Sequence, residues 1–328
     1  MPSIDSENLL LNGDFASWGR LEDAGSPEGL SCPTWQQTFL ADRWKVRYAG
    51  LGDREVTQAR ADAKDPEGLP GYALELRGID DLGQSVFVGQ RIEAAEAGRY
   101  RRALRFSIAA MVDGVDDPAV PLRLWIGTAR KADIFGNAFN DETNLRKPID
   151  LQPFPAGSWV HLETLIDGNN LPATGLSVEI EIPAAILGKA GARLRLSRAI
   201  LTDAETPDGP PASSAAIVKP LLSRFFQRHD ASTVNSIGRA LVVNAHELHF
   251  QFRFGEMRAF PACTLPREGE GLRIFDLDGR IQAGFTYDLT YRSRGSVILR
   301  ASKKDHGLRD GFLSFVGYRA AILLDAEL

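Results

Sequence analysis

The chain has 328 residues, of which 44% are hydrophobic and 25% charged, and its formal net charge at pH 7 is −5. This composition is typical of a folded globular protein and excludes wholesale disorder. The length is enough for two domains. A net negative charge provides no general attraction for a phosphate backbone, so nucleic acid is not an expected partner.

The N-terminal residues 1–12 lack the features of a secretory signal. They have no basic region, and the apolar run Leu9–Leu11 is too short for the hydrophobic part of a signal peptide. No stretch of the sequence approaches the length of a membrane span, so we expect no membrane insertion. Cys32 and Cys263 lie far apart, and we expect reduced thiols and synthesis in a cytoplasm.

Short alternating apolar runs fill the first half of the chain. Asn12-Gly13 is a turn signal, Trp44 lies in an apolar segment where we expect a core residue, and Glu93–Gly98 is expected to be a turn before a strand over 100–110. The runs are Tyr72/Leu74/Leu76, Leu104/Phe106/Ile108, Leu122/Leu124/Ile126, Leu176/Val178/Ile180/Ile182 and Leu194/Leu196. Many short strands separated by Gly, Pro and Asp indicate an antiparallel sandwich.

A Pro-rich segment separates the two halves of the chain. Residues 203–214 contain three prolines and no large apolar residue, which is typical of a semi-rigid linker. We therefore predict an N-terminal domain over 1–204, a linker over 205–219 and a C-terminal domain over 220–328. The predicted fold class is all-β, with two antiparallel, jelly-roll-like β-sandwich domains.

The second half has the most strictly alternating stretch of the sequence, Leu248–Phe254. Its four apolar residues alternate with His249, Gln251 and Arg253, which predicts a strand with one buried face. Asp278-Gly279, between apolar segments, predicts a two-residue hairpin turn. The C-terminal domain is therefore a second antiparallel β unit.

Four motifs of the N-terminal domain occur in a recognisable order. They are Asn8–Trp18, Gly89–Ile92, Ala97–Tyr100 leading into a strand, and Gly157–Val160. In this order they resemble the jelly-roll carbohydrate-binding modules that are joined to glycosidases and found in phage fibres, and the resemblance spans Asn8–Asp203. It implies glycan binding by this domain.

Those modules often hold a structural calcium near the first turn and near an acidic residue of the last strand. Asn12 and Asp14 are the candidate ligands that the resemblance implies. The last strand, Leu194–Ile200, has no acidic residue, which argues against the ion. No other cofactor is expected.

Three segments of the C-terminal domain carry a second resemblance. Ser223–Arg228, Met257–Pro261 and Tyr318–Leu328 resemble, in this order, the C-terminal domain of fibres and minor tail proteins of phages and phage-like particles. Gene transfer agents, which are domesticated phage-like particles, carry fibres of the same kind. The resemblance implies a fibre or spike on the particle surface, made in a bacterial cytoplasm, in contact with other particle structural proteins and homo-oligomeric, with a trimer favoured.

Two sets of residues have the pattern of a sugar-binding surface, which needs an aromatic face and polar groups for hydroxyls. On the strand over 121–127, the apolar residues take one face, so Trp125 and Arg123 share the other. Trp159, His161 and Glu163 share a parity in the same way. The alternative for Trp125 is that a loop or a neighbouring subunit covers it. The long polar segment 131–150 either lines a ligand groove or contacts another subunit.

The candidate motifs for catalysis and metal binding in this sequence are incomplete or absent. His246-Glu247-Leu248-His249 lacks a histidine at position 250, which a zinc HExxH motif requires. Asp276–Gly279 is better explained by the hairpin than by a calcium loop. The sequence has no GxSxG, no P-loop and no GxGxxG followed by a helix. Glu179 and Glu181 share a strand face, and we expect them to be solvated rather than catalytic.

Basic residues allow two interpretations. The loop Lys303–Arg309 and an arginine set either cradle acidic capsule sugars or belong to a solvated, charge-mixed surface. The arginine set is Arg77, Arg105, Arg123 and Arg195.

These observations predict a non-enzymatic structural adhesin that binds host cell-surface or capsular polysaccharide. Two alternatives stay open. One is a polysaccharide depolymerase of the tailspike type, and the other is an architectural collar or baseplate component without glycan affinity.

Overall fold

The structure, a computed structural model, describes residues 8–16, 30–32, 37–39, 41, 43–48, 56–64, 70–98, 103–115, 120–135, 148–167, 174–205, 220–231, 236–265, 272–275, 280–282, 284–308, 312–317 and 320–326. The chain divides into two compact units, Met1–Lys219 (unit 1) and Pro220–Glu327 (unit 2). Both are built from antiparallel β-sheets, which confirms the predicted all-β class. Of the predicted linker, residues 206–219 lie outside the described part. No described helix has the length and hydropathy needed to cross a membrane.

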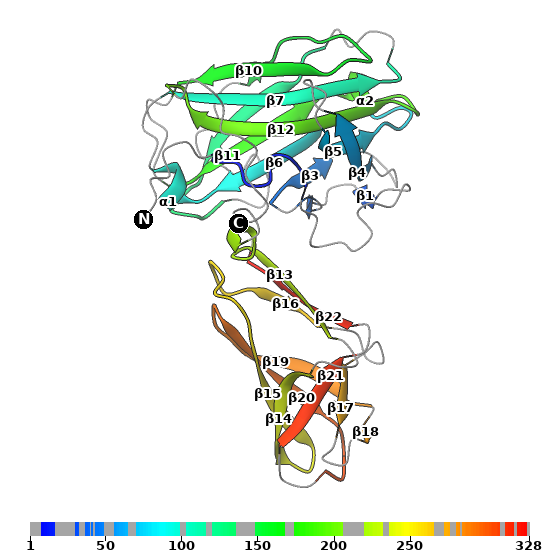
Figure 1. The fold of residues 1–328 in the computed structure, drawn as a ribbon, viewed down its shortest axis with the longest axis vertical. Helices are drawn as coiled ribbons and strands as arrows, with labels where there is room; N and C mark the ends of the chain where they lie inside the picture. Colours follow the sequence, from blue (N-terminus) through cyan, green and yellow to red (C-terminus); the bar gives the residue numbers. More distant parts are fainter. Residues whose placement is uncertain are drawn as a thin grey trace. The chain divides into compact units, whose positions relative to one another are not determined.

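Unit 1 contains two six-stranded antiparallel sheets. The first has the order β1 (Leu30–Cys32), β4 (Val56–Lys64), β5 (Pro70–Arg77), β12 (Arg193–Asp203), β7 (Leu104–Asp113) and β10 (Val160–Ile166). The second has the order β2 (Gln37–Phe39), β3 (Lys45–Tyr48), β6 (Val86–Ile92), β11 (Leu176–Ile182), β8 (Arg123–Thr128) and β9 (Ile149–Asp150). Figure 1 shows β10, β7 and β12 side by side across this unit.

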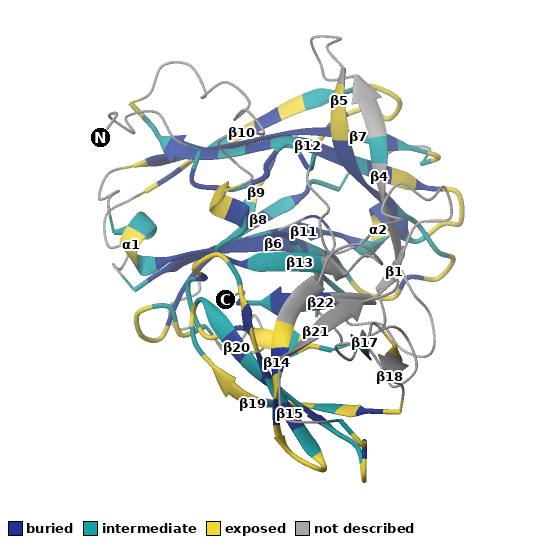
Figure 2. Ribbon diagram, turned by 60° about the horizontal axis from the view of Figure 1, so that its bottom comes forward, coloured by how far each residue is buried: buried dark blue, intermediate teal, exposed yellow. Residues whose placement is uncertain are grey.

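The five predicted apolar runs of the first half lie in or directly beside β5, β7, β8, β11 and β12, and their side chains form the core of unit 1, except that Tyr72 is 38% exposed. The alternation of apolar and polar residues along each run explains this agreement, because every second side chain of a strand points to the same face. Figure 2 shows how much of β6 and β7 is buried. Two short helices, α1 (Ala94–Ala97) and α2 (Ala184–Leu187), precede β7 and β12. The predicted turn at Glu93–Gly98 is thus one helical turn.

The N-terminal segment is attached to the sandwich through side chains. The Asn8 side chain accepts hydrogen bonds from the N–H groups of Leu10 and Leu201, at 3.0 and 2.8 Å. Trp44, predicted to be a core residue, is 1% exposed and packs on Phe15 with ring centroids 4.8 Å apart. The segment therefore belongs to the folded core. Trp18 and Trp35 lie outside the described residues.

Unit 2 contains a small sheet and a large sheet. The three-stranded sheet has the order β13 (Phe226–Ala231), β22 (Ala320–Asp325) and β16 (Ala262–Thr264). The seven-stranded sheet has the order β18 (Ile281–Gln282), β17 (Leu272–Phe275), β21 (Phe312–Gly317), β14 (Ser236–Asn244), β15 (Glu247–Arg253), β20 (Ser296–Ser302) and β19 (Thr286–Arg292). Figure 2 shows exposed residues along β19, at the edge of this sheet.

The predicted strand over Leu248–Phe254 is β15, which ends one residue earlier, at Arg253. Leu248 is fully buried, and it belongs to one cluster with Leu324 of the small sheet. The β17–β18 hairpin exists, but Phe275 pairs with Ile281, so the connection is longer than the predicted two-residue turn. The Asp278-Gly279 pair itself lies outside the described residues.

The segments that carry the second resemblance meet in one corner of unit 2. The backbone N–H of Arg258 donates to the carbonyl of Arg224 at 2.9 Å, and its guanidinium donates to the carbonyl of Ala326 at 3.1 Å. The N–H of Ala326 donates to the carbonyl of Phe225 at 2.7 Å. Three stretches that are far apart in sequence therefore form one hydrogen-bonded structure.

Candidate functional site

The outer face of the sheet β2-β3-β6-β11-β8-β9 gathers aromatic and charged side chains. Residues such as Val178 of β11 and Leu124 of β8 point into the core, so the residues that alternate with them along each strand point outward. Cross-strand pairing places Trp125 of β8 opposite Glu179 of β11, and Glu179 opposite Gly89 of β6. We call this surface the Trp125 face, and its members are Lys45, Arg47, Phe87, Gly89, Arg91, Arg123, Trp125, Ser177, Glu179 and Glu181.

Trp125 is partly exposed and held in one orientation. Its indole N–H donates to Oε2 of Glu181 at 2.7 Å. The other oxygen of Glu181 accepts from the Ser85 hydroxyl at 2.8 Å and lies 3.5 Å from the Arg123 guanidinium. Arg123 in turn lies 3.2 Å from Asp150. The structure thus brings together Trp125 and Arg123, as predicted, and leaves part of the ring accessible.

A second ion pair lies beside the tryptophan. The Arg47 guanidinium is 2.9 Å from Oε2 of Glu179 and also lies over the Phe87 ring, 4.2 Å from its centroid. Gly89 makes room for this arrangement, because a Cβ atom there would come within 2.5 Å of Glu179 Cγ. Burial raises the pKa of Glu179, and the neighbouring Arg47 only partly offsets this effect.

One end of the Trp125 face is closed by the segment that follows β8. The Phe135 ring lies 5.0 Å from the Arg91 guanidinium, and the N–H of Asp133 donates to the carbonyl of Thr174 at 2.9 Å. Ser177 is 1% exposed at this end, and among the described residues its hydroxyl has no hydrogen-bond partner. The first part of the predicted 131–150 connection therefore packs on the face, and residues 136–147 lie outside the described part.

The expectation that Glu179 and Glu181 are solvated is wrong. Their side chains are 15% and 10% exposed, and each carboxylate has charged or hydrogen-bonding partners. Their partners lie far away in sequence, 132 residues for Arg47 and 56 for Trp125. No local pattern could have revealed these partners, because strand pairing brings them together.

The second predicted set lies on the other sheet, at the edge strand β10. Trp159 is partly exposed, and His161 and Glu163 are exposed. Glu163 lies 3.4 Å from Arg105 and 4.0 Å from His161. Because β8 and β10 belong to different sheets of the sandwich, the structure does not combine this set with Trp125.

The residues of the first turn do not fit the calcium site that the resemblance implies. The carbonyl oxygen of Asn12 already accepts hydrogen bonds from the Trp44 indole at 2.9 Å and from the Phe15 N–H at 3.0 Å. Asp14 accepts from the N–H of Ala16 at 3.3 Å. Among the described residues, no group of three or more His, Cys, Asp or Glu side chains is arranged to hold a metal ion. Hydrogen bonds already use the Asn12 carbonyl and Oδ1 of Asp14.

The predicted arginine set is distributed over ion pairs rather than gathered in a cradle. The pairs are Arg77–Glu75 at 3.0 Å, Arg195–Glu75 at 2.9 Å, Arg195–Asp113 at 3.0 Å, Arg105–Glu163 at 3.4 Å and Arg123–Asp150 at 3.2 Å. Burial acts to raise the pKa of Glu75, but the hydrogen bonds from Arg195 and Arg77 outweigh it and hold the pKa below its usual value. The charge-mixed surface is the correct interpretation for these arginines.

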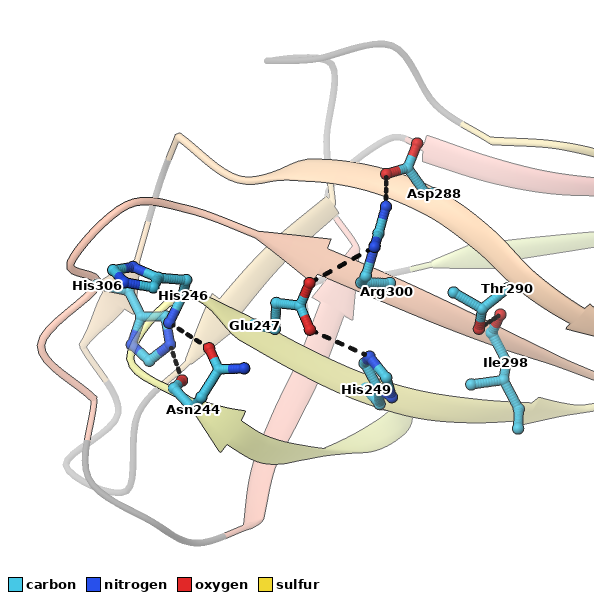
Figure 3. A network of polar contacts seen from close by, with 9 residues as sticks. All are labelled: Asn244, His246, Glu247, His249, Asp288, Thr290, Ile298, Arg300 and His306. Atoms are coloured by element: carbon cyan, nitrogen blue, oxygen red, sulfur yellow. Dashed lines mark hydrogen bonds and ion pairs between the residues drawn. The ribbon is translucent and has the colours of Figure 1, made fainter.

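A polar network crosses three strands of the larger sheet of unit 2 (Figure 3). Arg300 lies 2.9 Å from Asp288 and 3.5 Å from Glu247, and Glu247 lies 3.9 Å from His249. The hydrogen bond with Asp288 raises the pKa of Arg300. Because these ion pairs are largely exposed, they contribute little free energy.

The sequence suggested that His306 belongs to an exposed basic loop, but its side chain is buried. It is 6% exposed, its Nε2 lies 2.9 Å from the carbonyl oxygen of Asn244, and its Nδ1 accepts from the N–H of Leu308 at 3.0 Å (Figure 3). Nε2 therefore carries the proton, and His306 anchors the loop. Lys303 lies over the Phe285 ring, 5.6 Å from its centroid. Arg309 lies outside the described residues.

No known protein family matches the chain, and no curated protein matches it in sequence. Solved structures with partial similarity include the enzymatically active domain of tailspike protein 4 of bacteriophage CBA120, at 12% identity and a TM-score of 0.36, over 59% of this chain and 21% of that one. The C-terminal family 22 carbohydrate-binding module of a Clostridium thermocellum xylanase matches at 14% identity and a TM-score of 0.33, over 56% of this chain and 99% of that one. The module TmCBM61, in complex with β-1,4-galactotriose, matches at 14% identity and a TM-score of 0.32, over 60% of this chain and 98% of that one. TM-scores of this size carry no inference about function, which has to come from the site.

Proposed function

We propose that this chain is a fibre or spike protein of a phage-like particle and that the Trp125 face of unit 1 binds surface polysaccharide. The observation that carries the proposal is Trp125 itself, a partly exposed ring whose indole N–H is held by Glu181 at 2.7 Å. Sugar rings stack on such aromatic faces, and Arg123 and Glu179 lie beside it to meet hydroxyl groups. A ring fixed in advance loses little conformational entropy on binding.

Replacing Trp125 and Trp159, the partly exposed tryptophans of the described residues, one at a time tests the site. The full chain with Trp125→Ala should bind cell-envelope polysaccharide at least tenfold more weakly in affinity electrophoresis. Trp159→Ala is the matched control, because Trp159 lies beside β10 on the other sheet. If only Trp159→Ala weakens polysaccharide binding, the site lies at β10 instead. Undiminished binding in both variants would refute the Trp125 site. A wild-type chain that binds no polysaccharide would favour an architectural collar or baseplate component.

We propose binding without cleavage. Both oxygens of Glu181 are engaged by Trp125, Ser85 and Arg123, and Glu179 pairs with Arg47, so these carboxylates have partners that hold the face together. Incubation of the pure chain with the bound polysaccharide should release no reducing ends.

One observation favours a depolymerase as the second candidate. Burial raises the pKa of Glu179, as in the general acid of a glycosidase, and Glu181 lies on the same strand face. Reducing ends that appear with the wild-type chain and vanish with Glu179→Gln would support this candidate over the adhesin.

Assignment to a particle is supported by the sequence resemblance of the C-terminal domain. A single shallow sugar site with millimolar affinity supplies about −4 kcal/mol, and several linked copies raise the avidity by about 10² to 10⁴. We therefore propose a homo-oligomer, in the first place a trimer, on the particle surface in contact with other particle structural proteins. Light scattering that shows a stable monomer at micromolar concentration would contradict this part.

A further inference from the structure

The immediate surroundings of Trp125 are acidic. Glu179 lies directly across the sheet from Trp125, and Glu181 is hydrogen-bonded to its indole. Arg123, two residues before Trp125 on β8, lies between Glu181 at 3.5 Å and Asp150 at 3.2 Å. Among the described residues, a ligand that stacks on the ring therefore meets two carboxylates and a cation that already has two acidic partners.

The other arginines of the Trp125 face are engaged away from the ring, and the charge of Lys45 acts on Glu179. The Arg47 guanidinium is held between Glu179 at 2.9 Å and the Phe87 ring at 4.2 Å. Arg91 is 9% exposed, and its guanidinium lies 5.0 Å from the centroid of the Phe135 ring. Within the described part of the chain, Arg47 is therefore committed to Glu179 and Phe87, and Arg91 is largely buried against Phe135, so neither is directed toward Trp125.

From this arrangement we infer that the Trp125 face selects neutral polysaccharide and rejects chains of uronic acids. The inference rests on the proposed glycan-binding function and adds the class of ligand to it. A uronate carboxylate stacked over Trp125 would approach Glu179 and Glu181, and like charges at close range in a partly buried site repel. Neutral hydroxyl groups instead use the carboxylates as hydrogen-bond acceptors and Arg123 as a donor.

The experiment compares matched polymers on the full chain. A panel of neutral polysaccharides (glucan, galactan, mannan and xylan) and acidic ones (polygalacturonate, alginate and hyaluronate) is screened, and binding counts when Trp125→Ala abolishes it. Each neutral polymer that binds is then oxidised at its primary hydroxyls to carboxylates, and each acidic one is carboxyl-reduced. We expect neutral polymers to bind, their affinity to change less than twofold between 50 and 500 mM NaCl, and oxidation to weaken binding at least tenfold.

Two variants test the origin of the selectivity. Glu181→Gln keeps an oxygen that accepts the Trp125 N–H but removes one negative charge, so the affinity for the oxidised polymer relative to that for the neutral polymer should rise at least threefold. The control is Glu205→Gln, an exposed glutamate outside the face, which should change neither.

The outcomes separate the inference from the proposed function. Trp125-dependent binding of an acidic polymer that weakens tenfold or more in 500 mM NaCl would overturn the inference and leave the glycan-binding function standing. An unchanged response of Glu181→Gln to the oxidised polymer would overturn the charge-based explanation. Failure to bind any polymer of the panel would overturn the proposed function and the inference with it.

Discussion

Replacing Glu75 by Gln tests the ion pairs on the outer face of the first sheet of unit 1. Glu75 is 4% exposed and accepts hydrogen bonds from Arg195 at 2.9 Å and Arg77 at 3.0 Å. A hydrogen bond to a charged group contributes about 1.5–3 kcal/mol. The amide keeps one acceptor oxygen, and the two arginine side chains are 20% and 30% exposed, so solvent offsets part of the loss. We expect the free energy of unfolding of unit 1 to fall by about 2 kcal/mol at pH 7.

The loss should depend on pH in a defined direction. Burial acts to raise the pKa of Glu75, but the hydrogen bonds from Arg195 and Arg77 outweigh it and lower the pKa. The folded state then binds fewer protons than the unfolded chain in the acid range, so the stabilisation is complete above the unfolded pKa of about 4.3. It is lost as the pH falls through the lower folded pKa. The difference between the wild-type chain and Glu75→Gln should therefore shrink below about pH 4.

Tryptophan fluorescence isolates unit 1 in this assay, because all five tryptophans occur at or before residue 159. Urea unfolding is followed at several values from pH 3 to pH 7. Glu163→Gln is the control, since this carboxylate lies in the same sheet with its side chain 46% exposed, 3.4 Å from Arg105. Its removal should change the free energy by less than about 0.5 kcal/mol. Equal losses in the two variants, or a Glu75→Gln loss that does not vary with pH, would refute the reasoning.

Three further predictions concern packing and reactivity. Trp44→Phe removes the hydrogen bond to the carbonyl of Asn12 and leaves a void, so circular dichroism in urea should show a loss of about 2 kcal/mol, and an unchanged midpoint would contradict it. Gly89→Ala places a Cβ 2.5 Å from Glu179 Cγ and should cost about 1–3 kcal/mol, whereas Gly83→Ala, with open space around it, should cost less. Burial raises the pKa of Cys263 to about 11, so alkylation at pH 8, followed by peptide mass spectrometry, should be about 200-fold slower than for a free cysteine and should become fast in urea.

The strands could be predicted from the sequence because their signal is local. Alternation places Leu122, Leu124 and Ile126 in the core and therefore Trp125 and Arg123 together on the other face, as the structure has them. The same reasoning failed for the closed end of this face. Ser177 has the parity of an outward residue, yet it is buried beneath a segment whose position no periodicity encodes.

The charged residues show the limit of sequence reasoning more clearly. Glu179 was expected to be solvated because charged residues on strand faces usually are. It is buried instead, and Arg47, 132 residues away, supplies the opposite charge that partly offsets the cost of this burial. His306 was grouped with its basic neighbours, yet Asn244 and Leu308 hold it inside the loop. In both cases the deciding partner is fixed by tertiary contacts, which a single sequence does not specify.

The corner at Arg258 gives a physical reason for the motifs of the second resemblance. Arg258 joins the strand entry at Arg224 to the C-terminal strand at Ala326, so residues in three distant segments must be compatible with one hydrogen-bonded geometry. A sequence pattern of this kind records a requirement of the fold. On the Trp125 face, ion pairs orient the side chains, and Gly89 makes room beside Glu179. On the proposed function, Glu179, Glu181 and Arg123 would set the selectivity between neutral and acidic glycans, and substitution of these residues is the direct way to alter it.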